Sequence, residues 1–139
     1  TADIPPDETL EREGDWSAAS GFDCAMELMR LPEPPTAIFC ANDMMAVGAM
    51  GALCQLGLSV PDDVSLVGYN DIELMRHLRP ALTTCRVPSY ELGKRAVETL
   101  VEIALLGRPH RAMVTKLECA LISRDSVAPP KALREGRAP

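Results

Sequence analysis

Two identical dipeptides stand where polar side chains could contact a ligand. Asn42-Asp43 and Asn70-Asp71 each follow a short apolar run of strand-like composition. An amide carries hydrogen-bond donors and acceptors together, which suits a ligand rich in hydroxyl groups, such as a sugar. Asn and Asp are also common in turns and at helix N-caps, so both dipeptides have a purely structural interpretation as well. We predict ligand contacts for Asn42 and Asn70, and an N-cap role for Asp43, which directly precedes an apolar helix.

Trp16, the only tryptophan, is a third candidate for ligand contact. It follows Gly14-Asp15 at the entrance to a predicted helix. The face of an indole ring can stack on the apolar face of a sugar ring, and small-molecule pockets commonly combine such a surface with a few polar groups. A single tryptophan is more often a core residue, so both interpretations remain open at this point.

The sequence lacks the motifs of common catalytic sites. It contains no Gly-rich phosphate-binding loop, no HExxH and no GxSxG. His77 lies in an Arg-flanked loop, and His110 lies beside a proline turn. A catalytic α/β domain in which Cys40 or Cys85 pairs with His77 is an alternative that no spacing supports. We therefore expect no enzyme activity, no cofactor and no metal site.

Composition and charge narrow the class of protein further. The formal net charge of −6 repels phosphate backbones, so this chain is not expected to bind DNA by itself. The five cysteines form no CxxC pair, and their apolar or small neighbours predict reduced thiols in the core of a cytosolic protein. The sequence has no leader-like start, and its apolar runs are too short to span a bilayer. We expect a soluble, cytoplasmic chain without membrane contact.

Helical spacing and short apolar runs alternate along the chain. The predicted helices cover residues 17–31, 43–56 and 89–106, and the predicted strands cover 37–41, 64–69, 82–87 and about 112–122. Gly57 closes the second helix, the first 15 residues form a loop or short edge strand, and the tail from Ala128 is expected to fray. This alternation predicts an α/β fold with a doubly wound parallel sheet that helices cover on both faces. Ligands bind such sheets beyond the carboxyl ends of their strands.

The predicted helices differ in character. Residues 44–54 carry no charged or amide side chain, and a helix that is apolar all round must be covered on more than one side. Because glycines there allow close backbone approach, we predict a subunit interface of a homodimer. The helix at 89–106 has one apolar face and opposite-charge pairs, which is typical of a half-exposed helix. The predicted interface residues are Met44, Val47, Gly48, Gly51 and Leu78.

Five strings, taken together, resemble the LacI/GalR (lactose repressor) family of transcription regulators. They are EREGDWSAASGF at 11–22, PTAIFCANDMMAVGA at 35–49, GLSVPDDVSLVGYND at 57–71, PALTT at 80–84 and RDSVAP at 124–129. The resemblance implies that Trp16 lies against a sugar or purine effector and that Asn42 contacts effector hydroxyls. Asn70 falls where many members carry an aspartate bonded to sugar hydroxyls, so this sequence departs from the pattern there.

The resemblance also implies a domain organisation. The fold would be that of a type I periplasmic-binding-protein-like C-terminal lobe in truncated form. Residues 1–88 and the return strand at 117–127 would belong to this lobe, residues 89–116 would cross to the N-terminal lobe, and 128–139 would form a disordered tail. The truncation would leave an exposed sheet edge.

The implied function is that of an effector-sensing and dimerising module. A small sugar-like ligand would bind between two lobes, and DNA would be bound only through a helix-turn-helix head that this chain lacks. The alternative is a periplasmic sugar-binding protein of a transporter, which shares the two-lobed fold. The apolar helix and the five scattered cysteines argue against that alternative.

Overall fold

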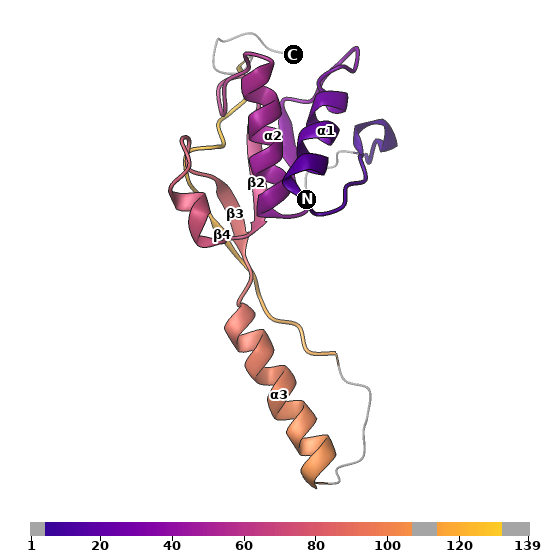
Figure 1. The fold of residues 1–139 in the computed structure, drawn as a ribbon, viewed down its shortest axis with the longest axis vertical. Coiled ribbons are helices and arrows are strands. Elements are labelled where there is room, and N and C mark those ends of the chain that lie inside the picture. Colours follow the sequence, from indigo (N-terminus) through magenta and orange to yellow (C-terminus); the bar gives the residue numbers. More distant parts are fainter. Residues whose placement is uncertain (1–4, 107–113, 132–139) are drawn as a thin grey trace.

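The computed structural model describes residues 5–106 and 114–131 (Figure 1). Its elements, in chain order, are η1 (Glu8–Leu10), α1 (Ala18–Leu28), β1 (Ala37–Phe39), α2 (Asp43–Gln55), β2 (Ser65–Asn70), η2 (Glu73–Arg76), β3 (Thr83–Arg86), α3 (Ser89–Leu106) and β4 (Ala120–Ile122). The three predicted helices and four predicted strands are all present. Most of their ends differ by a few residues, but β4 begins at Ala120, eight residues after the predicted start of the last strand, and residues 112 and 113 lie outside the described residues. The two short 3₁₀ helices were not predicted.

Four strands form one sheet in the order β1-β2-β3-β4. β1 and β2 pair in parallel, as do β2 and β3, so the predicted α/β class is confirmed. β4 pairs with β3 in antiparallel orientation, with Cys85 opposite Leu121. The chain leaves the sheet from β3 and returns to it as β4 after α3, which explains why the last strand runs in the reverse direction (Figure 1).

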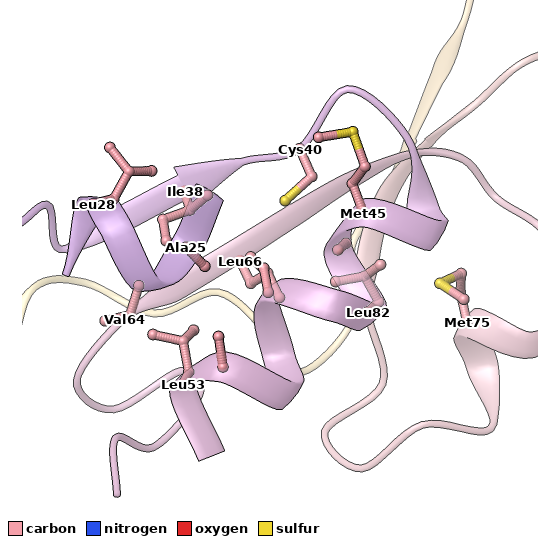
Figure 2. Close-up of a cluster of buried hydrophobic side chains, with 13 residues drawn as sticks. Ala25, Leu28, Ile38, Cys40, Met45, Leu53, Val64, Leu66, Met75 and Leu82 are labelled. Carbon is pink, nitrogen blue, oxygen red and sulfur yellow. The ribbon is translucent and has the colours of Figure 1, made fainter. Parts of the chain in front are cut away.

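The core lies between one face of the sheet and the pair of helices α1 and α2. Ile38 and Leu66 are register partners on neighbouring strands, and both are buried in one cluster with Leu82 and residues of the two helices (Figure 2). The opposite face is only partly covered among the described residues, since Phe39 and Leu121 are each 65% exposed, whereas Ser65 and Thr83 are buried. The second helical layer that was predicted for this face is therefore not among the described elements.

The helix ends have identifiable causes. Ser17 caps α1 as predicted, because its side chain accepts a hydrogen bond from the backbone N–H of Ser20. Gly57 follows the end of α2 with φ of 72°, a conformation that favours glycine. The cap of α2 is Asn42, whose Oδ1 accepts from the backbone N–H of Met45 at 2.7 Å. The prediction that Asp43 is the cap is therefore wrong, because the Asp43 side chain turns into the interior instead.

Two buried glycines allow α1 and α2 to cross at close range. A Cβ atom at Gly48 would meet the backbone of Ala18 and Phe22, and one at Gly21 would meet the backbone of Met45. The backbone that approaches Gly48 thus belongs to the same chain, which corrects the interpretation of this glycine as a subunit contact. Gly48 holds the two helices of the lobe together.

The other predicted interface residues are at least partly exposed to solvent. Met44 is 41% exposed and Gly51 is exposed, while Val47 and Leu78 are partly buried against the core. None of these observations tests dimerisation, which stays a prediction.

Helix α3 extends away from the sheet on two chain segments (Figure 1). Its apolar side chains are exposed, with Leu92 at 51%, Leu100 at 64% and Leu105 at 77%. The predicted ion pair between Glu91 and Arg95 is present at 3.5 Å. The expectation of a half-exposed helix is therefore wrong for the described chain, which offers its apolar face no cover. None of the described helices has the length and apolar character needed to cross a bilayer.

Two further expectations need correction. Ala128 is anchored rather than frayed, since its N–H donates to Ser65 Oγ at 3.1 Å and its carbonyl accepts from the same hydroxyl. Residues 132–139 of the predicted tail lie outside the described residues. Among the cysteines, only Cys40 is a core residue, while Cys54 and Cys119 are exposed.

Substitution of Gly48 by Ala is expected to lower the free energy of unfolding by about 1–3 kcal/mol or more, because backbone atoms of α1 cannot yield to the new methyl group. The matched control is Gly51→Ala in the same helix, where the nearest atom would be Phe22 Cδ2 at 3.7 Å. That variant should be neutral or more stable, since alanine favours helix by about 1 kcal/mol over glycine. Urea unfolding followed by circular dichroism measures both, and equal stability of the two variants would contradict the proposed close crossing.

Candidate functional site

The carboxyl ends of β1 and β2 place the predicted ligand residues along one edge of the sheet. β1 ends at Phe39, which pairs with Val67, and Asn70 is the last residue of β2. Asn42, three residues beyond Phe39, and Asn70 therefore follow the carboxyl ends of two adjacent parallel strands. Asn42 also brings in Trp16 from the segment before α1, since its Nδ2 donates to the Trp16 carbonyl at 2.9 Å. Trp16, Asn42 and Asn70 thus lie on three chain segments that lead to the same edge, called the ligand-side edge below.

Trp16 is an exposed side chain and not a core residue. It is 65% exposed, and its backbone has φ of 71°. The flanking residues fix this turn, because the N–H of Ser17 donates to Asp15 Oδ1 at 3.0 Å and the N–H of Asp15 donates to Ser20 Oγ at 3.1 Å. Hydrogen bonds from Ser17 and Ser20 lower the pKa of Asp15 to about 2, so the turn keeps its carboxylate acceptor at neutral pH. The indole is presented to solvent by a well-bonded turn.

Asn42 has a structural role and also has hydrogen-bonding capacity left for a ligand. Its Oδ1 caps α2, and its Nδ2 uses one N–H bond on Trp16. An amide nitrogen has two N–H bonds, and an amide oxygen has two lone pairs, so one donor and one acceptor position remain for a ligand. The structural role of Asn42 fixes the direction in which those positions point.

Asn70 is more exposed to solvent than Asn42. It is exposed, and within the described part of the chain its side chain makes no hydrogen bond. Its φ of 115° lies in a region that L-residues rarely adopt. Asp71 follows with φ of 57°, so two consecutive non-glycine residues are held in left-handed conformations at the end of β2.

A buried carboxylate that sequence reasoning misassigned lies directly beneath this turn. Asp43 is 1% exposed, and its Oδ1 accepts from Thr84 Oγ1 at 2.6 Å. Its Oδ2 accepts from the backbone N–H of Ile72 at 2.8 Å. Thr84 Oγ1 in turn accepts from the N–H of Asp71 at 3.3 Å. The start of α2, strand β3 and the turn after β2 are therefore joined by one hydrogen-bonded group.

A second carboxylate, which sequence reasoning missed, is paired with two arginines. Asp71 Oδ2 accepts from Arg86 Nε at 2.7 Å, and Asp71 Oδ1 accepts from Arg124 Nη2 at 2.6 Å. Burial alone would raise the pKa of Asp71, but the hydrogen bonds and charges of Arg124 and Arg86 outweigh it and hold the pKa below its usual value. The sequence signal for this cluster was weak, namely one arginine near the end of each of two predicted strands.

Among the residues considered for catalysis, Cys40 lacks the properties of a nucleophile. Burial, followed by the charges of Cys24 and Asp43, raises the pKa of Cys40 to about 12, which keeps this thiol protonated and unreactive. His77 is exposed in the loop after η2. Across residues 5–106 and 114–131, no three His, Cys, Asp or Glu side chains are grouped in a way that could hold a metal ion.

A cavity of about 420 Å³ lies along β1, the outermost strand of the described sheet. Residues of α1, β1 and α2 form about half of its lining, and the segment before α1 contributes much of the rest. The cavity reaches Trp16 and Ala41 at the ligand-side edge. The outer side of β1 pairs with no other described strand, so the unpaired strand edge that was predicted is present in this structure.

Comparisons with known proteins agree with this architecture. Residues 1–127 match the family described as periplasmic binding protein-like domain. The chain is 36% identical over 115 residues to the HTH-type transcriptional repressor PurR of Aliivibrio salmonicida, a match that covers 83% of the chain and 34% of that repressor. It is 35% identical over 126 residues to the HTH-type transcriptional repressor PurR of Vibrio atlanticus, covering 91% of the chain and 37% of the relative. The chain thus spans about a third of the length of these relatives.

Solved structures show the same relationship. A dimeric Lac repressor with a C-terminal deletion superposes with a TM-score of 0.79 at 39% identity, covering 86% of this chain and 44% of the repressor. A complex of the transcriptional regulator CelR with cellobiose superposes with a TM-score of 0.82 at 33% identity, covering 90% of this chain and 38% of CelR. By sequence and by fold, the chain belongs to the periplasmic binding protein-like domains of LacI/GalR-type transcription regulators.

Proposed function

We propose that this chain is the effector-sensing module of a LacI-type DNA-binding regulator and that a small, sugar-like ligand binds at the ligand-side edge. The observation that carries the proposal is the hydrogen bond from Asn42 to the Trp16 carbonyl, which holds an exposed indole beside polar strand ends. Asn70 adds an amide whose donors and acceptors are not used within the described chain. An apolar ring face flanked by two amides matches the chemistry of a sugar ring, whose faces are apolar and whose rim carries hydroxyls.

The relatives support a regulatory role for the whole protein. Those described above are named as transcriptional repressors or regulators, and the CelR structure is a complex with cellobiose. In our proposal, residues 1–88 and 117–127 form one lobe, and residues 89–116 cross to a second lobe. The exposed apolar face of α3 and its extension away from the sheet support this division (Figure 1). DNA would be bound through a helix-turn-helix head outside this chain, in a cytoplasmic protein without catalytic activity.

Such a regulator works by a shift between two lobe arrangements. A ligand that contacts both lobes favours the arrangement that it binds more tightly, and only this difference in affinity can move the equilibrium. The alternative of a periplasmic sugar-binding protein gains no support from the relatives described above, which are repressors.

Trp16 provides a direct optical test, because it is the only indole in the sequence. The protein is titrated with glucose, galactose, cellobiose, adenosine and guanosine, and binding is followed both by calorimetry and by Trp16 emission. We expect at least one of these compounds to bind and to change the emission. For that compound, Asn70→Ala should weaken binding about fivefold, since one hydrogen bond contributes about 1 kcal/mol.

The matched control for this titration is Gln55→Ala, which removes an exposed amide at the far end of α2. It should leave affinity unchanged. Calorimetric binding without any change in Trp16 emission, or equal affinity of the Asn70→Ala variant, would show that the ligand binds elsewhere.

We also propose that the exposed side of α2 forms a homodimer interface. Met44, Val47 and Gly51 follow one another at three- and four-residue spacing and so share one helix face. Met44 and Gly51 are exposed, and Leu78 lies partly buried on the loop after η2. A contiguous apolar surface of this kind is typical of a subunit contact.

Val47→Arg is expected to convert dimers into monomers in sedimentation velocity experiments, because it places an unpaired charge in the proposed interface. Circular dichroism verifies that the variant folds. The control Ala19→Arg adds the same charge at an exposed position of α1 and should remain dimeric. A folded Val47→Arg variant that sediments as a dimer would rule out this face.

A further inference from the structure

The turn that presents Asn70 is strained and needs support from its surroundings. Asn70 and Asp71 have φ values of 115° and 57°. Backbone conformations of this kind are unfavourable for residues other than glycine and persist only where the surrounding structure determines them. The contacts that hold this turn therefore decide where the Asn70 amide points.

The backbone N–H and the carboxylate of Asp71 both contribute to this support. The Asp71 N–H donates to Thr84 Oγ1, and the N–H of Ile72, the next residue, donates to Asp43. Both carboxylate oxygens of Asp71 accept from arginines, and the side chain is only 5% exposed, so little of it can be reached by a ligand. Asp71 is thus placed to hold the turn and not to contact an effector.

The two arginines come from the strands that carry α3. Arg86 is the last residue of β3, shortly before α3 begins at Ser89. Arg124 lies just beyond β4, at the other end of the β3–β4 pair, where its Nη1 also donates to the carbonyl of Leu82 at 2.7 Å. Asp71 therefore binds both ends of the strand pair through which the chain leaves for α3 and returns from it (Figure 1).

The two ion pairs differ in strength. The Arg124 side chain is 15% exposed, whereas the Arg86 side chain is 57% exposed. Solvent screens the Arg86 pair, and exposed pairs contribute little to stability, while a buried pair is costly to break. Arg124 is thus the fixed partner of Asp71, and Arg86 is the partner that can be displaced.

We propose that Asp71 is a positioning residue that ties the Asn70 turn to the β3–β4 pair, so that movement of Asn70 is passed to the segments that carry α3. The proposal rests on the proposed function, because it assigns the ligand-side edge as the place where Asn70 moves. It goes beyond that function by naming the contacts through which ligand binding would move the segments that carry α3.

Amide hydrogen exchange on the 139-residue chain tests this proposal without any ligand. In Asp71→Asn, exchange at the β4 amides of residues 120–122 is expected to rise about tenfold relative to the amides of α2, although no hydrogen bond or ion pair joins the Asp71 side chain to these residues. Asp71→Glu, which keeps the carboxylate, should restore most of the protection. Asp125→Asn removes the same charge from an exposed position beside Arg124 and should leave exchange unchanged.

Arg86→Gln is the second variant, because it removes only the exposed pair and keeps the buried one. It should raise exchange at residues 84–86 and 120–122 while the Asn70 turn stays protected. Unchanged β4 exchange in Asp71→Asn and in Arg86→Gln would overturn the proposal, as would a uniform rise across the lobe in both variants.

The titration with sugars and nucleosides distinguishes a failure of the proposed function from a failure of the proposed role of Asp71. If none of these compounds binds the unmodified protein, the proposed function fails, whereas the exchange data still decide whether Asp71 couples the turn to the strands. If a compound binds, it should change exchange at residues 120–122 in the unmodified protein and not in Asp71→Asn.

Discussion

The carboxylate of Asp43 lies where the first turn of α2, the middle of the sheet and the turn after β2 meet. It is almost fully buried, and both of its oxygens accept hydrogen bonds, one from Thr84 on β3 and one from the backbone of Ile72. A buried carboxylate that lost these donors would be costly, so the three segments are constrained to stay together. Gly68 contributes to the same constraint, because a Cβ there would meet Asp43 Oδ1 and Leu82. The geometry of the ligand-side edge follows from this buried contact.

The neighbouring carboxylate of Asp71 has a different part in the same arrangement. Asp43 holds the backbone of this turn at Ile72, just after the end of β2. The ion pairs of Asp71 with Arg86 and Arg124 hold the same turn against β3 and the segment after β4. Asn42 supplies the third element, since one amide caps α2 and holds the Trp16 turn. The residues at the ligand-side edge thus divide into those that hold it together and those, Trp16 and Asn70, that are exposed to solvent there. What remains open is apolar, namely one sheet face, the groove along β1 and one side of α3.

Much of this could be predicted from the sequence because local signals agreed with the final packing. The alternation of apolar runs with helical spacing gave the order of strands and helices, and Ser17 and Gly57 marked helix ends through chemistry that acts within a few residues. The role of Asp43 could not be predicted, since a cap and a buried acceptor have the same local pattern and differ only in a contact with a strand about 40 residues away. The Asp71 cluster was missed for the same reason, as Arg124 is remote in sequence. Gly48 was given a partner subunit because spacing indicates a close approach but does not identify the approaching backbone.

The central claim is that the Asp43 contact to β3 holds the ligand-side edge together, and a double-mutant cycle measures that contact directly. The free energy of unfolding is determined for the unmodified chain, Asp43→Ala, Thr84→Val and the double variant. We expect a coupling energy of about 1.5–3 kcal/mol, the range for a hydrogen bond to a charged group. Coupling below about 0.5 kcal/mol, the level at which two sites behave independently, would contradict it.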